Sequence, residues 1–331
     1  MPETILLAFI TIGVALAFDF INGFHDAANS ISTVVATKVL SPLQAVLLAA
    51  VCNFVGVFIF GVAIAKTVGS GIILKEAATI TVILAALIGA IIWNLITWYK
   101  GLPSSSSHAL IGGLIGAAVA FKGFGAIVST GVTKVIIFIV LAPIIGFLGA
   151  ILFSIIVFSI SRKSNPFKVN SWFKRLQLIS ASWYSLGHGT NDAQKTMGVI
   201  AAVLFSAGLI GTFTIDTWVI IASYTAISLG TFFGGWRIIK TMGTKLTKLR
   251  PIDGFCAESS GAAVLIGTAH FGIPVSTTHV ISGSIMGVGS VKRVSGVRWD
   301  VAKEMIQAWI LTIPISALIA AVAFILLKFL I

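Results

Sequence analysis

The chain contains little charge and almost no cysteine. Only 10% of its 331 residues are Asp, Glu, Lys or Arg, while 57% are hydrophobic and the mean hydropathy is +1.07. A soluble domain carries roughly 25% charged residues. The two cysteines, Cys52 and Cys256, lie within or beside apolar stretches and are too few for a disulfide framework. This composition excludes a soluble globular domain and a small disulfide-rich secreted domain.

Long uncharged runs occupy most of the chain. No charged residue occurs from Val135 to Ser161, a run longer than the roughly 20 residues that cross a bilayer core. Similar runs lie at about 5–18, 43–65, 77–99, 199–215, 219–236, 259–291 and 305–327. Glu3 replaces the basic start of a signal peptide, so we expect a retained first helix. These runs predict an all-α polytopic membrane protein with about 10–12 transmembrane segments.

The positive charge is concentrated in short segments between the apolar runs. The formal net charge is +12, and residues 162–175 and 237–250 each carry five Lys or Arg side chains. Short basic loops of membrane proteins stay in the cytoplasm. We therefore expect both loops to be cytoplasmic, and we expect no nucleic-acid partner.

Two polar patterns each occur twice, in the same order. Gly-Phe-His-Asp-Ala at 23–27 is echoed by Gly-Thr-Asn-Asp-Ala at 189–193. Pro-Ser-Ser-Ser-Ser-His at 103–108 is echoed by Pro-Val-Ser-Thr-Thr-His at 274–279. Internal repeats of this kind are common in secondary transporters.

The repeated patterns predict two transmembrane repeats, residues 1–160 and 176–331, joined by a basic cytoplasmic linker at 161–175. The loop at 237–250 is much more basic than its first-half equivalent near 66–76. Two parallel repeats would place both loops in the cytoplasm, where both should be basic. The difference favours inverted repeats with discontinuous helices and both termini outside.

Each Pro-Ser/Thr pattern precedes an apolar run, as at the start of a helix. Proline suits the first helical turn, and hydroxyls cap free backbone N–H groups. We therefore expect helices to begin at Pro103 and Pro274. Their N-termini would attract an oxyanion because they present N–H donors and partial positive charge. The candidate anion-binding residues are Ser105, Ser106, Ser107, Ser276, Thr277 and Thr278.

The Asp patterns place carboxylates in membrane-spanning sequence, where ionisable groups mark ion pathways. Gly23 and Gly189 would let the helices unwind and offer backbone carbonyls. The candidate coupling-cation residues are Asp26, Asn29, Asn191, Asp192, Thr196 and Glu258. Na⁺ would bind at Asp26, Asn29, Asn191 and Asp192, and the carboxylates would instead hold protons in a proton-coupled carrier.

Three further polar residues have structural interpretations. Lys195 would pair with Asp192 or extend toward the membrane interface. His108 and His279 are expected to form structural hydrogen bonds. An intramembrane hydrolase built on Ser107 and His108 is disfavoured, because adjacent residues on a helix point about 100° apart. We expect no enzymatic activity and no tightly bound cofactor.

With these motifs the chain resembles the inorganic phosphate transporter (PiT) family. The resemblance rests on residues 23–30, 189–198 and 274–279 and extends over essentially the whole chain. It implies cation-coupled uptake of inorganic phosphate by alternating access, with phosphate near the Ser/Thr-bearing helix ends and cations near the Asp motifs. The form with His25 and the short linker resemble bacterial members, which implies a minimal prokaryotic permease in the cell membrane.

Several alternatives stay open at the level of the sequence. His25 stands where many PiT members have Asn, so both H⁺ and Na⁺ remain candidate coupling cations. A sulfate permease of the same family and a passive anion channel are alternative functions. The expected partners are phosphate, the coupling cation and the lipid bilayer, and a homodimer is an open alternative for the assembly.

Overall fold

The computed structural model describes residues 2–59 and 61–330, which form α-helices and short helical turns without a β-strand. The first half contains α1 (Pro2–Ala36), α2 (Pro42–Val55), α3 (Ala63–Gly71), α4 (Ile80–Lys100), α5 (Ser106–Lys122) and α6 (Ser129–Ser161). The second half contains α7 (Pro166–Ser206), α8 (Thr217–Phe233), α9 (Trp236–Lys240), α10 (Pro251–His270), α11 (Thr277–Lys292) and α12 (Trp299–Leu330). The prediction of an all-α protein is confirmed.

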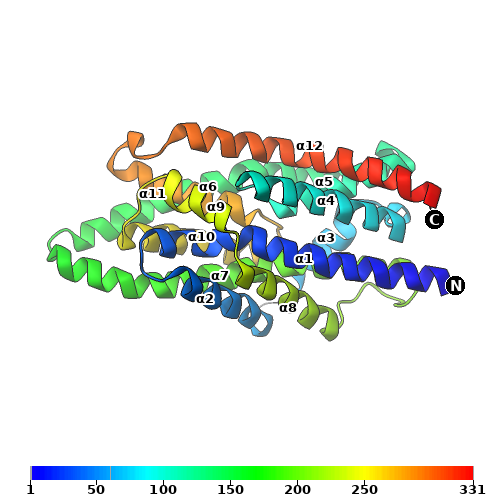
Figure 1. Cartoon of the computed structure of the whole chain (residues 1–331), viewed down its shortest axis with the longest axis horizontal. Coiled ribbons are helices and arrows are strands. Elements are labelled where there is room, and N and C mark those ends of the chain that lie inside the picture. Colours follow the sequence, from blue (N-terminus) through cyan, green and yellow to red (C-terminus); the bar gives the residue numbers. More distant parts are fainter. Residues whose placement is uncertain (1, 60, 331) are drawn as a thin grey trace.

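The two halves run through the helix bundle in opposite directions. Both termini lie at one end of the bundle, and the connection from α6 to α7 lies at the other end (Figure 1). Consequently α1 and α7 point in opposite directions, as do α6 and α12. These directions are those that an inverted repeat requires.

Four helices are long and apolar enough to cross a membrane: α1, α4, α6 and α12. Two helix pairs pass the same test only when each pair is taken together, and both are bent: α2 with α3 by 87°, and α8 with α9 and the π-helical turn Thr241–Lys245 by 61°. Broken helices are therefore present, but they lie outside the Asp motifs where the sequence suggested them. Long apolar side chains such as Ile136, Leu148 and Ile160 point outward from α6, as expected for a surface that contacts lipid.

The expected unwinding at Gly23 and Gly189 is wrong, because α1 and α7 are helical through both residues. These glycines instead allow close contact with another backbone. A Cβ atom at Gly23 would lie 2.2 Å from the carbonyl oxygen of Ile227, and one at Gly189 would lie 2.7 Å from the Cα atom of Asn53. Their small size is needed for helix packing.

The helix boundaries in the linker and in two apolar runs differ from the expectation. Residues 166–175 of the linker already belong to α7, because Pro166 occupies its first turn and the Asn165 side chain accepts a hydrogen bond from the Phe167 N–H (2.9 Å). The run at 259–291 is interrupted between α10 and α11. The run at 199–215 ends as helix at Ser206.

The helix pairs α4–α5 and α10–α11 form two hairpins, and each hairpin contacts a long helix of the opposite half. Helix α5 packs against α12, and α11 packs against α6. Glycines on α5 and α11 make this contact possible, since a Cβ atom at Gly116 would lie 2.0 Å from the Ala317 carbonyl oxygen and one at Gly287 would lie 2.3 Å from that of Phe147. The prediction that small residues permit close helix packing is confirmed.

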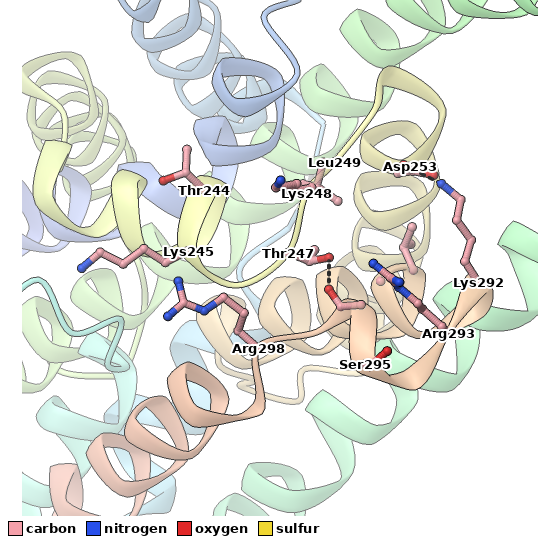
Figure 2. A pocket seen from close by; sticks show the side chains of 13 residues that line it. Thr244, Lys245, Thr247, Lys248, Leu249, Asp253, Lys292, Arg293, Ser295 and Arg298 are labelled. Carbon is pink, nitrogen blue, oxygen red and sulfur yellow. Dashed lines mark hydrogen bonds and ion pairs between the residues drawn. The ribbon is translucent and has the colours of Figure 1, made fainter.

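The end of the bundle that carries the α6–α7 connection is strongly basic. Figure 2 shows a hollow there between the segment after α9, the end of α11 and the start of α12. Its volume is about 410 Å³. Five basic side chains line it: Lys245, Lys248, Lys292, Arg293 and Arg298. Its one acidic side chain, Asp253, pairs with Arg250 (3.0 Å) and Lys292 (3.7 Å).

Gly287→Ala should destabilise the protein by about 1–3 kcal/mol, because the new methyl group would collide with a backbone carbonyl that cannot move aside. The melting temperature in detergent measures the effect. Gly13→Ala in α1 is the matched control, since no atom lies within 4 Å of the place that its Cβ atom would take. Equal melting temperatures for the two variants would contradict the role of Gly287.

Candidate functional site

Helices α5 and α11 each begin inside the bundle with a serine cap. Ser105 Oγ accepts a hydrogen bond from the His108 N–H, and Ser276 Oγ accepts one from the His279 N–H, both at 3.2 Å. The helices therefore begin at the residue after each serine, inside the expected segments 103–108 and 274–279, but the expected place of Pro103 and Pro274 in the first helical turn is wrong. Serine is the better N-cap because its side chain satisfies a backbone donor that proline would leave free.

The two capped helix ends meet. The rings of His108 and His279 lie 4.7 Å apart in an edge-to-face arrangement, and His279 also stacks on Trp309 at 4.0 Å. All six candidate anion-binding residues are buried: Ser105, Ser106, Ser107, Ser276, Thr277 and Thr278. Two segments about 170 residues apart in the sequence thus form one hydroxyl-rich, enclosed cluster, which we call the hydroxyl cluster.

Helices α1 and α7 bring their polar side chains to the hydroxyl cluster. Ser106 donates to Asp26 Oδ1 (3.4 Å), and Thr277 donates to Asp192 Oδ2 (3.3 Å). Asn29 donates to the hydroxyls of Thr277 (3.2 Å) and Thr278 (2.9 Å). The anion and cation candidates, which the sequence treats as two groups, therefore form one continuous site.

A basic side chain contacts each of the two carboxylates. His25 Nδ1 lies 2.6 Å from Asp26 Oδ1, and Lys195 Nζ lies 2.5 Å from Asp192 Oδ1. Lys195 also donates to Ser107 and, at 3.1 Å, to the carbonyl oxygen of Val275. Lys195 is thus an ion-pair partner of Asp192 and does not extend to the membrane interface. Its ammonium group lies directly beside both hydroxyl-bearing segments.

His188 also lies beside a carboxylate, and together with Asp26 and Asp192 it forms a group that could hold a metal ion. One ligand atom each from Asp26, His188 and Asp192 lies within 4.8 Å of the others. His188 Nε2 is 3.3 Å from Asp192 Oδ2 without the alignment of a hydrogen bond. Carboxylate and imidazole ligands suit several cations. His25 and Lys195, however, already contact one oxygen of each carboxylate.

Asn191 does not join this group. Its amide nitrogen donates to the carbonyl oxygens of Gly187 (2.9 Å) and Leu265 (3.1 Å), so the side chain is held against α10. The contact between α7 and α10 is therefore enough to explain this residue of the motif, without a role in ligand binding.

Comparison with known proteins agrees with this geometry. The sequence profile described as the phosphate transporter family matches residues 22–320, which span α1 to α12. The chain belongs to the phosphate transporter family. A probable low-affinity inorganic phosphate transporter of Rhizobium meliloti is 55% identical over 314 residues, which cover 95% of this chain and 94% of the relative. A protein of Bacillus subtilis with the same description is 50% identical over 334 residues, covering 99% of both chains.

The fold is also that of a solved member. The structure of a sodium-dependent phosphate transporter superposes with a TM-score of 0.91 at 25% sequence identity, and the match covers 98% of this chain and 100% of the other. The resemblance to the PiT family is thereby confirmed, and this phosphate transporter is a permease and not an enzyme.

Glu258 forms a separate buried group in this phosphate transporter. Thr33 and Ser180 donate to its carboxylate at 2.5 Å each, and Gln177 donates at 3.0 Å. The sequence motifs did not single out these three partners. The only available signal was the spacing of Gln177 and Ser180, two polar residues three positions apart on one face of α7.

Thr196 lies away from the hydroxyl cluster. Its hydroxyl has no hydrogen-bond partner among the described residues and lies alongside the carboxylate of Asp19. The six cation candidates therefore fall in several places: Asp26, Asn29 and Asp192 lie at the cluster, and Asn191, Thr196 and Glu258 lie outside it.

Lys195→Met should destabilise the fold by about 3–5 kcal/mol, because Asp192 would be left as an unpaired buried charge. The double variant Lys195→Met/Asp192→Asn removes both charges and should recover most of this loss. Chemical or thermal unfolding in detergent of the wild type, both single variants and the double variant measures the coupling. Purely additive effects would show that the pair does not interact.

Proposed function

We propose that this phosphate transporter is a cation-coupled symporter that brings inorganic phosphate into the cell by alternating access. The observation that carries the proposal is the charge balance of the buried core. Asp19, Asp26, Asp192 and Glu258 are all buried there, and Lys195 is the only buried lysine or arginine among the described residues.

Phosphate would add further negative charge to a core that already has more acids than bases. Each uncompensated buried charge costs several kcal/mol. Cations or protons must therefore enter with the anion, and this requirement distinguishes a symporter from a passive channel. Once compensated, the anion and its cations would cross together as one half of the protein moves against the other.

The hydroxyl cluster suits phosphate better than sulfate. Two helix N-termini and six hydroxyl-bearing residues supply donors, and Lys195 supplies one positive charge among them. Phosphate also carries a proton at neutral pH, so it needs an acceptor, and Asp26 and Asp192 lie at the cluster as acceptors. A site for fully ionised sulfate would offer donors alone.

The coupling cation is best assigned as a proton. The solved relative is described as sodium-dependent, and this chain shares its fold. In this chain, however, His25 and Lys195 each contact one oxygen of Asp26 and Asp192, the two carboxylates at which Na⁺ would bind. Protonatable side chains that already neutralise these carboxylates leave less need for a metal ion, which favours proton coupling.

Equivalent features in the two halves support the proposed inverted repeats at 1–160 and 176–331. Each half has a bent helix pair, a hairpin with a serine-capped helix, and a proline within its last long helix (Pro143 and Pro314). Each also has one isolated β-bridge, Ile73 with Ile127 and Thr247 with Val297. These features follow one another in the same order in both halves, which favours a repeat over a chance resemblance.

The basic end of the bundle is proposed to face the cytoplasm, and both termini to face outward. The loops at 162–175 and 237–250 and the hollow of Figure 2 all belong to the basic end. Lysine and arginine remain on the cytoplasmic side of bacterial membranes. In this orientation within the cell membrane, phosphate would enter from the end of the bundle that carries both termini.

Asp26→Asn should abolish phosphate uptake while leaving the protein folded, because an amide keeps the size of the side chain and can still hydrogen-bond to His25. Asp192→Asn is a poorer test, since it would leave Lys195 as a buried unpaired charge. Uptake of labelled phosphate into proteoliposomes measures the effect, with Ser106→Ala as the milder comparison because neighbouring hydroxyls remain. Normal uptake by Asp26→Asn would exclude the proposed role.

Phosphate uptake by the wild type should respond to an imposed pH gradient and not to a Na⁺ gradient. Separate gradients in the same proteoliposomes test this, and a response to Na⁺ alone would overturn the proton assignment. Sulfate at equal concentration should leave uptake nearly unchanged. Flux that cannot be driven uphill by any cation gradient would favour the passive channel.

A further inference from the structure

Asp19 is the one core acid without a partner among the described residues. Asp26 contacts His25, Asp192 contacts Lys195, and Glu258 accepts three hydrogen bonds. Asp19 is fully buried, and neither of its carboxylate oxygens accepts a hydrogen bond within the described part of the chain. An ionised carboxylate is costly in this enclosed arrangement, and it would need water or a partner that the closed site does not provide.

The surroundings of Asp19 are polar. Asn22 on α1 and Thr196 on α7 lie within interaction distance of its carboxylate, and Tyr224 on α8 lies nearby. A buried oxygen atom of each of these three side chains makes no well-aligned hydrogen bond within the described ranges. The charged groups within reach are Asp192 and Lys195, both on α7 and engaged with each other. Tyr224 is the only titratable side chain of α8. Buried polar atoms without well-aligned hydrogen bonds indicate that an ion, a water molecule or a proton binds there.

A proton satisfies this environment most simply. Protonation removes the charge of Asp19 and turns the acceptor into a hydrogen-bond donor. The amide and hydroxyl oxygens of its neighbours are then available as acceptors. A proton also needs no coordination shell, unlike a metal ion, which would require several oxygens at close range.

The position of Asp19 along α1 places it on one side of the hydroxyl cluster. Asp19 precedes Asp26 by seven residues, which is about 10 Å along a helix, toward the N-terminal end of α1 (Figure 1). Thr33, which binds Glu258, follows Asp26 by seven residues on the opposite side. In the proposed orientation Asp19 therefore lies between the hydroxyl cluster and the outside, and Glu258 lies between the cluster and the cytoplasm.

We propose that Asp19 is the residue that carries the coupling proton. Its carboxylate takes a proton from outside water when the site is open outward, stays neutral while phosphate crosses, and releases the proton when the site opens inward. The proton is the only group transferred, so the residue returns to its starting state after each cycle. This assignment deepens the proposed function and rests on it.

Two transport modes separate this role from phosphate binding. Net uptake driven by a pH gradient requires the proton to be released in each cycle. Exchange of external labelled phosphate for internal unlabelled phosphate, at equal pH on both sides, does not require it. Asp19→Asn, which mimics the neutral acid, should lose pH-driven accumulation and keep exchange close to the wild-type rate. Asp216→Asn, which changes an exposed acid at the N-terminal end of α8, is the matched control and should keep both modes.

The outcomes distinguish the proposals. Full pH-driven accumulation by Asp19→Asn would overturn the assignment, and so would the loss of exchange in a variant that purifies as a stable protein. Absence of both modes in the wild type would refute the proposed function itself. If Asp19→Asn does not fold, Asp19→Glu decides: pH-driven uptake should persist with a shifted pH dependence, and an unshifted profile would contradict the role of Asp19.

Discussion

Two helices begin in the interior of this membrane protein, and the rest of the structure depends on how their free ends are satisfied. The first N–H groups of a helix have no partner within it, and a lipid-embedded bundle offers no water to replace one. Ser105 and Ser276 cap α5 and α11, and further hydroxyls surround both ends. The same donors that make the ends costly to bury make them suitable for an oxyanion. The proposed binding site therefore coincides with the place where the fold must satisfy the most free backbone donors.

This demand explains the packing around the site. Each short helix must be held in place from outside its own half, and the long helices α12 and α6 of the opposite halves do so. Gly116 and Gly287 allow the backbones to touch, because lipid provides no hydrophobic drive and close packing must hold the helices together. Movement of one half against the other would consequently change the contact of each capped helix with its long partner helix.

Charge balance provides the second constraint. The buried acids outnumber the single buried lysine of the described chain, and three of the core acids have different partners: His25 for Asp26, Lys195 for Asp192 and neutral donors for Glu258. Within the same residues, Asp19 alone has none. Unpaired buried acids favour bound protons or cations, which supports the proposed dependence of phosphate transport on a cation.

The amino-acid sequence by itself determined the membrane class, the repeated motifs, the family resemblance and the candidate residues, because apolar run length, charge distribution and motif repetition are local properties of the chain. It misplaced the starts of the helices after Pro103 and Pro274 and wrongly expected unwinding at Gly23 and Gly189, since capping and close backbone contact depend on distant partners. Only the tertiary structure joined the anion and cation candidates into one site, paired Lys195 with Asp192 and left Asp19 unpaired among the described residues. These facts involve residues on separate helices, so they follow from packing and cannot be read from spacing.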